Sequence, residues 1–157
     1  MSRDTTEVLD GFRRVLQALR EGSREAEAGL NISGAQLFVL QVLAQSPGLS
    51  LSEVAARTRT HQSSVSVVVT RLVDAGLLKR SRASDDARRM VLTLTPKSRR
   101  LLDKAPEVPQ HRLISVVDAL PARQRAALAT SLRTIADALD VDERVPMFFE
   151  QSGRARR

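Results

Sequence analysis

The chain has 157 residues, of which 42% are hydrophobic, with no cysteine and a formal net charge of +7. This length suits one compact domain with a helical extension, and the lack of cysteine excludes a thiol redox switch, a disulfide framework and a cysteine-ligated zinc site. No apolar run is long enough to span a bilayer, and the first residues contain no apolar segment of the signal-peptide type. We therefore expect a cytoplasmic protein that does not interact with a membrane.

The basic excess is confined to one segment of the chain. Between Ser50 and Arg100 there are eleven Lys or Arg and four Asp or Glu, whereas the rest of the chain contains fourteen of each. A basic patch on one unit is typical of a surface that contacts nucleic-acid phosphates. We expect this segment to bind double-stranded DNA.

The N-terminal part predicts two helices. From Thr6 to about Ala28, apolar residues recur at steps of three and four and form one stripe of an amphipathic helix, which Gly22 weakens near its end. Asn31 or Ser33 then offers an N-cap for a second helix. Because this second helix is apolar on most sides, we expect it to lie in the core.

The centre of the chain predicts two helices joined by a tight turn. Ser50 and Glu53 form a capping-box pattern that starts a helix of about two turns. After a turn at 57–60, a longer helix is predicted from Gln62 to Asp74, and Gly76 follows it as a stop signal. The inward stripe of the longer helix consists of four apolar residues at helical spacing, Val65, Val68, Val69 and Leu72.

A basic hairpin and further helices follow. Two strands are predicted at 77–82 and 89–95, with a short tip between them. A helix then starts at Pro96, is interrupted by Pro106 and Pro109, and resumes near residue 110 before a last helix that opens after residue 121. The order of helix, turn, helix and hairpin predicts a winged helix-turn-helix, a mainly α fold with a small β-wing.

The second central helix supplies candidate contacts to the DNA major groove. With its apolar stripe inward, the residues that face outward are Gln62, Ser63, Ser64, Ser66, Val67, Thr70 and Arg71. Small hydroxyl side chains allow close approach, Arg71 can reach phosphate or guanine, and Val67 can contact a thymine methyl group. The competing interpretation is that Ser63 and Ser64 merely suit the first turn of a helix.

The hairpin supplies three further candidates, Arg82, Arg88 and Arg89. An arginine at a hairpin tip fits the narrow minor groove, where the negative potential is strongest. Asp86, two residues before Arg88, can orient that guanidinium through a paired hydrogen bond. The alternative is a surface ion pair worth ~0–1 kcal/mol.

At these residues the chain resembles the MarR family (multiple antibiotic resistance regulators). DARRMVLTLT, from Asp86 to Thr95, matches the family's wing signature D-x-R-x-x-x-L-x-L-T, and SSVSVVVTRLVDAGLLKR, residues 63–80, resembles its recognition helix. The chain departs from the family pattern at Val67, where many relatives have a polar residue, and at Pro96, which replaces part of a glycine step. The lack of cysteine excludes the peroxide-sensing branch.

The resemblance implies a two-fold homodimer that represses transcription from a pseudo-palindromic operator. It implies Arg88 in the minor groove with Asp86 as its orienting partner, and many relatives are released by small aromatic or lipophilic molecules. On this basis we expect one domain over 1–157, with a winged lobe at about 33–97, dimerisation helices at about 5–28 and 98–149, and a basic tail at 150–157. We expect the apolar run at 145–149 to pack against a partner or the core, and the basic end to be disordered.

Other functions are less compatible with the sequence. His61 and His111 are far apart in the chain and have no cysteine or glycine-rich loop to accompany them, so we expect no catalytic residue, no metal site and no cofactor. We expect His61 to face solvent or phosphate and His111 to lie at the surface or a dimer interface. A non-specific architectural DNA-binding protein remains the alternative, since it would use the same basic patch.

A small-molecule effector is left open by the sequence. The chain has four Phe and no Trp or Tyr, which disfavours a pocket built on aromatic stacking. One hypothesis is an aliphatic pocket lined by residues such as Leu19, Phe38 and Leu113; the other is that the protein responds to no small molecule.

Overall fold

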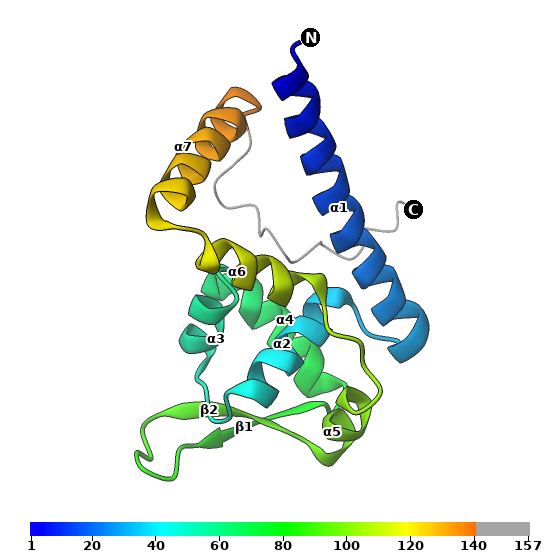
Figure 1. Cartoon of the computed structure of the whole chain (residues 1–157). Helices are drawn as coiled ribbons and strands as arrows, with labels where there is room; N and C mark the ends of the chain where they lie inside the picture. Colours follow the sequence, from blue (N-terminus) through cyan, green and yellow to red (C-terminus); the bar gives the residue numbers. More distant parts are fainter. Residues whose placement is uncertain (141–157) are drawn as a thin grey trace.

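The computed structural model describes residues 1–140, so the expectations for 145–157 lie outside the described residues. Its elements, in chain order, are α1 (Arg3–Leu30), α2 (Gly34–Gln45), α3 (Leu51–Arg57), α4 (Gln62–Asp74), β1 (Leu78–Arg82), β2 (Met90–Leu94), α5 (Pro96–Leu102), α6 (Pro109–Ala119) and α7 (Ala122–Ala138). Helices α2 to α5 and the hairpin form a winged lobe, and α1 and α7 extend away from it on one side (Figure 1). The prediction of a mainly α fold with a small β-wing is confirmed.

Helix α2 forms the centre of the core. Its N-cap is Ser33, whose hydroxyl accepts a hydrogen bond from the Gln36 N–H while the Gln36 side chain accepts one from the Ser33 N–H. Most of the helix is buried, and Phe38 has no exposed surface. The prediction of a core helix is therefore confirmed. Asn31, the other N-cap candidate, instead ends α1 with φ 54°, a left-handed conformation that Asn tolerates well.

The hairpin is fixed to the lobe at its base. The two strands pair antiparallel, with Leu78 opposite Leu94. The N–H of Leu92 donates to the carbonyl oxygen of Leu49 at 2.9 Å, so β2 is also joined to the segment before α3. Leu78 of β1 and Leu92 of β2 are buried, whereas the tip of the hairpin projects away from the lobe (Figure 1).

Helices α5 and α6 are separated at Pro106 and Pro109, where the sequence predicted an interruption. Gln41 of α2 holds the segment between these helices: its Nε2 donates to the Pro106 oxygen at 2.7 Å and its Oε1 accepts from the Val108 N–H at 3.2 Å. Pro109 then packs against α1 at Gly22, where an added Cβ would lie 2.4 Å from the Pro109 Cδ. Gly22 lowers the helix propensity of α1, but it permits the close approach of α1 and α6.

The two helices that extend from the lobe carry uncovered apolar side chains. Helix α7 contains no buried residue, and Ala26 is the buried residue of α1. Large apolar residues with at least 39% of their surface exposed are Val8, Leu9, Val15 and Leu16 on α1 and Leu128, Leu132 and Ile135 on α7. Within residues 1–140, no helix is both long and apolar enough to cross a membrane.

Candidate nucleic-acid interface

Helix α4 has one apolar and one polar face. Its buried residues are the predicted stripe, Val65, Val68, Val69 and Leu72. Of the seven residues predicted to face outward, Ser64 and Ser66 are half-buried and the other five are exposed. Val67 is 54% exposed, so an apolar side chain interrupts the otherwise polar face. The structure therefore places the seven candidates together on the uncovered side of α4.

The turn between α3 and α4 fixes how α4 is presented. Thr58 is fully buried, and its hydroxyl donates to the Val54 oxygen at 2.9 Å. Arg59 follows with φ 54°, and its guanidinium lies 3.3 Å from the carboxylate of Asp118 at the end of α6. The carbonyl oxygen of Asp118 also accepts from Arg125 of α7 at 2.7 Å. The turn that positions α4 is thus in contact with the corner between α6 and α7.

Strand β1 adds a cation beside α4. Arg80 donates to the Thr70 hydroxyl at 3.4 Å, and that hydroxyl donates to the Ser66 carbonyl oxygen at 2.9 Å. Because residues two apart share a face of a strand, Arg80 and Arg82 lie on the same side of the hairpin. Arg80 is a candidate contact that the sequence prediction omitted, and its alternation with Arg82 could have indicated it.

The tip of the hairpin is organised by backbone contacts. The Asp86 carboxylate accepts a hydrogen bond from the Arg88 N–H at 2.9 Å, and Arg82 donates to the Ala87 carbonyl oxygen at 2.9 Å. The expected contact of Asp86 was with the guanidinium of Arg88; the contact present is with its backbone. Asp86 therefore shapes the turn from which the exposed Arg88 side chain projects.

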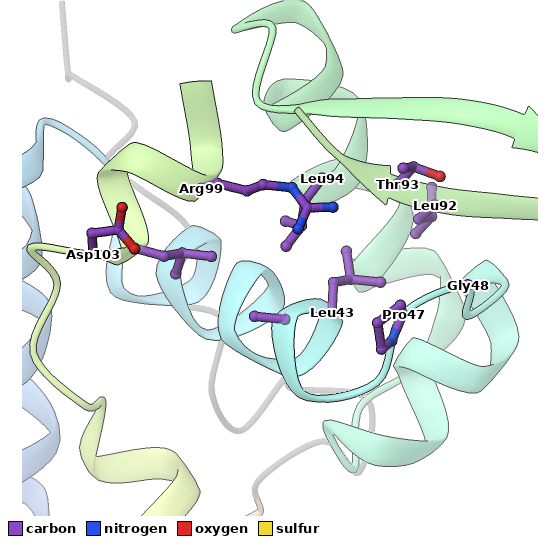
Figure 2. Close-up of a pocket in the computed structure, with 10 residues that line it drawn as sticks. Leu43, Pro47, Gly48, Leu92, Thr93, Leu94, Arg99 and Asp103 are labelled. Carbon is purple, nitrogen blue, oxygen red and sulfur yellow. The ribbon is translucent and has the colours of Figure 1, made fainter. Parts of the chain in front are cut away.

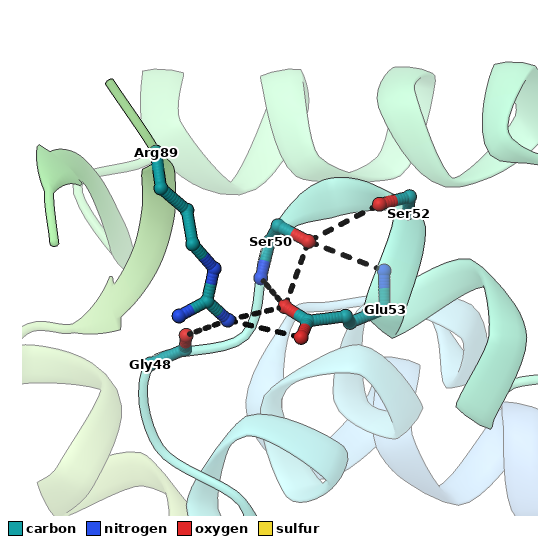
Figure 3. A network of polar contacts seen from close by, with 5 residues as sticks. All are labelled: Gly48, Ser50, Ser52, Glu53 and Arg89. Atoms are coloured by element: carbon teal, nitrogen blue, oxygen red, sulfur yellow. Dashed lines mark hydrogen bonds and ion pairs between the residues drawn. The ribbon is translucent and has the colours of Figure 1, made fainter. Parts of the chain in front are cut away.

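Arg89 is bound within the lobe (Figure 3). One of its guanidinium nitrogens lies 2.7 and 2.9 Å from the two carboxylate oxygens of Glu53 and donates to the Gly48 carbonyl oxygen at 3.3 Å. The same carboxylate accepts from the Ser50 N–H at 2.7 Å, which completes the predicted capping box of α3. The network joins the start of β2 to the N-terminus of α3.

The charges of this network reinforce one another. The Ser50 N–H, and after it the Arg89 guanidinium, lower the pKa of Glu53 from its ordinary 4.5 to about 2. The Glu53 carboxylate in turn raises the pKa of Arg89. Glu53 is therefore ionised at neutral pH and holds the base of the hairpin against the lobe.

The two histidines occupy different environments. His61 is exposed and precedes the first turn of α4. His111 is half-buried, and its ring packs edge-to-face on Phe38, with 4.8 Å between the ring centroids. The expected position of His111 at the surface or a dimer interface stays a prediction. Burial lowers the pKa of His111, because it disfavours the charged ring. Among the described residues, no group of three His, Asp or Glu side chains could hold a metal ion.

Of the residues suggested for a ligand pocket, Phe38 contacts the ring of His111. Phe38 is part of the core, and Leu19 and Leu113 pack against it. On α6, Gln110 Oε1 and His111 Nε2 are buried without a hydrogen-bond partner in the described part of the chain. Buried polar atoms are normally satisfied by protein, water or ligand, so the start of α6 has unused hydrogen-bonding capacity.

An exposed second helix with a basic hairpin beside it defines the winged helix-turn-helix class of DNA-binding proteins. Residues 30–89 match the family model described as MarR family. An HTH-type transcriptional repressor of Mycobacterium tuberculosis is 30% identical over 112 residues, which make up 71% of this chain and 81% of the repressor. The chain belongs to the MarR family and is a DNA-binding transcriptional regulator, not an enzyme.

Further relatives and solved structures agree with this assignment. The HTH-type transcriptional regulator FarR of Neisseria gonorrhoeae is 26% identical over 130 residues, covering 83% of this chain and 89% of FarR. The structure of BpsR from Bordetella bronchiseptica is 30% identical, with a TM-score of 0.54 over 83% of this chain and 93% of BpsR. A MarR/EmrR family regulator from Acinetobacter sp. ADP1 has a TM-score of 0.60 at 15% identity over 89% of this chain and 99% of its own, a likeness of fold.

Proposed function

We propose that the protein is a homodimeric repressor that binds a pseudo-palindromic operator, with α4 in the major groove and the hairpin in the minor groove. The observation that carries this proposal is the exposed face of α4. The buried residues Val65, Val68, Val69 and Leu72 lie on the opposite face of the helix, so this face points away from the core. In this arrangement Gln62 and Arg71 are long enough to reach base edges, and the serines permit close approach to the backbone.

The hairpin cations have different proposed roles. Arg88, exposed at the tip, enters the minor groove, and Asp86 orients it by fixing the turn. Arg82 and Arg80 contact phosphates beside α4. Arg89 was expected to contact DNA, but its bonds to Glu53 and Gly48 support a positioning role instead, in which it sets the angle of the hairpin.

A homodimer is supported by the apolar surface of α1 and α7. These helices fall within the regions proposed for dimerisation, at about 5–28 and 98–149, and the lobe does not cover their leucine and valine side chains. Contiguous exposed apolar surface favours association with a second protein surface. In a two-fold dimer the same faces meet, and the two α4 helices are presented to successive turns of DNA.

Release by a small aromatic or lipophilic molecule is the last part of the proposal. BpsR is described as a protein whose DNA binding is regulated by 6-hydroxynicotinic acid. In this chain the pocket hypothesised at Leu19, Phe38 and Leu113 gains support from the unpartnered atoms of Gln110 and His111, which could bind a polar group of a ligand. The expected cytoplasmic location belongs to the same proposal, because such a regulator must reach DNA.

The test separates sequence-specific binding from architectural binding. Duplexes bound by the full chain would be selected from a random pool, and their affinity compared with that of an unrelated duplex by competition at about 150 mM salt. A specific regulator should bind the selected duplex at least ~10³-fold more tightly. Equal competition by the unrelated duplex would instead identify an architectural protein.

A further inference from the structure

A cavity of about 300 Å³ lies between the end of α2, strand β2 and α5 (Figure 2). Its lining residues come from these three elements and from the corner after α2: Leu43, Ala44, Pro47, Gly48, Leu92, Thr93, Leu94, Arg99, Leu102 and Asp103. None of them belongs to α1, α4, α6 or α7, so the cavity is separate from both the recognition helix and the pocket hypothesised at Phe38. Its volume is at the lower end of the range for small-molecule sites.

The lining combines aliphatic side chains with the guanidinium of Arg99 and the carboxylate of Asp103. Leu43 and Leu92 are almost fully buried and form an apolar wall. Arg99 is an exposed residue, and its side chain extends from α5 into the space between α2 and β2, toward Leu94 (Figure 2). In the described part of the chain, Arg99 has no side-chain hydrogen bond or ion pair, although Asp103 lies one helical turn further on.

The helix that carries Arg99 is basic, and the acidic residue at the cavity is Asp103. Helix α5 contains Lys97, Arg99 and Arg100 and no acidic residue, and Asp103 follows the helix as its C-cap. The planar fork of a guanidinium matches the two oxygens of a carboxylate. The lining contains no aromatic ring, so it offers van der Waals contact to an alkyl group rather than stacking.

We propose that this cavity is a binding site for a small organic anion, a monocarboxylate with an aliphatic body. The carboxylate pairs with the guanidinium of Arg99, and the alkyl group lies against Leu43, Leu92 and Leu102. A compact inorganic anion would use the charge and leave the apolar wall exposed, whereas a neutral lipophile would use the wall and leave Arg99 unpaired. Recognition requires both parts of the ligand.

The position of the cavity would couple this site to the hairpin. Leu92 and Leu94 belong to β2, and Gly48 provides the carbonyl oxygen that binds Arg89. A ligand in the cavity therefore contacts both sides of the joint between the hairpin and the lobe. The resulting effect on DNA affinity rests on the proposed function, but the binding site itself does not.

The experiment is calorimetric titration of the full chain, without DNA, with octanoate. We expect saturable one-site binding to the wild type, at least tenfold weaker binding to Arg99→Gln, and binding within twofold of wild type for Arg100→Gln, which removes an adjacent exposed charge outside the cavity. Ala44 lines the cavity at an exposed position of α2, so the larger side chain of Ala44→Leu should occupy part of the cavity and also weaken octanoate binding. Circular dichroism melting of each variant verifies that it is folded.

Ligand chemistry completes the test. Octanamide and inorganic phosphate should each bind at least tenfold more weakly than octanoate, because each lacks one of the two recognised parts. Equal octanoate binding by Arg99→Gln and wild type, or equal binding of octanamide and octanoate, would overturn the proposal. Since no DNA is present, these outcomes are independent of whether the chain recognises an operator.

Discussion

At the scale of single residues, the basic hairpin contains two kinds of arginine. Arg88 is exposed at a tip whose turn is fixed by Asp86, whereas Arg89 is bound to Glu53 and to the Gly48 carbonyl oxygen. A cation that already has a carboxylate partner contributes less to phosphate binding than one that is exposed. The two neighbouring residues therefore have different expected effects on DNA affinity.

Replacement of Arg88 by alanine should weaken binding to the selected duplex at least tenfold, because it removes the cation proposed for the minor groove. Fluorescence anisotropy of a labelled duplex measures the effect. Arg100→Ala, which removes an exposed charge from α5, serves as the control and should change affinity much less. An unchanged affinity of the Arg88 variant would refute the minor-groove assignment.

Glu53 should make stability depend on pH in the acid range. Its pKa is lowered in the folded chain to about 2, against an ordinary value of 4.5, so its ionised form favours folding. That contribution is present in full above about pH 4.5 and is lost as the pH falls toward 2. The difference in melting temperature between wild type and Glu53→Gln should therefore shrink on acidification from about pH 6 to about pH 3.

Glu25→Gln, which neutralises an exposed carboxylate on α1, is the matched control for this measurement. A difference between wild type and Glu53→Gln that stays constant across the acid range would show that the Ser50 and Arg89 contacts do not stabilise the charged carboxylate.

At the scale of elements, α1 and α6 meet at a position that accepts only a very small residue. The Gly22 backbone approaches Pro109 so closely that an added Cβ would lie 2.4 Å from the proline Cδ and 2.7 Å from its Cγ. At Gly11, in the same helix, nothing lies within 4 Å of an added Cβ. Substitution by alanine raises the helix propensity at both positions but creates a clash only at Gly22. Comparing the two variants therefore separates the effect of packing from the effect of helix propensity.

Gly22→Ala should destabilise the protein by ~1–3 kcal/mol, because the methyl group forces α1 and α6 apart. Gly11→Ala should be neutral or stabilise by up to about 1 kcal/mol, since alanine is the better helix former. Urea unfolding of both variants measures the difference. Equal stabilisation by the two substitutions would mean that the helices do not pack as described.

The elements themselves were predictable from local patterns, and their contacts were not. The capping-box pattern of Ser50 and Glu53 predicted the start of α3. The spacing of four apolar residues predicted the buried face of α4: Val65, Val68, Val69 and Leu72. The bond between Glu53 and Arg89 joins residues 36 apart in the chain, and no local pattern indicates it. The contact between His111 and Phe38 was not predicted for the same reason, since the two residues are far apart in the sequence.

At the scale of the whole molecule, α1 and α7 carry apolar side chains that the described part of the chain leaves exposed. A second copy that covers them would place two winged lobes on one duplex. In sedimentation equilibrium at micromolar concentration, the protein should have about twice the chain mass of 17.3 kDa. Leu132→Asp should shift it toward monomer and weaken operator binding, and a wild-type monomer at this concentration would exclude the proposed dimer.

The most direct test of DNA recognition is hydroxyl-radical footprinting of the full chain on a duplex selected from the random pool. Two protected half-sites related by a two-fold axis, with their centres about one helical turn or a multiple of it apart, are expected from two α4 helices in successive major grooves. Flanking protection in the minor groove should disappear in the Arg88→Ala variant. Uniform protection without boundaries, unaffected by that substitution, would contradict sequence-specific binding by the winged lobe.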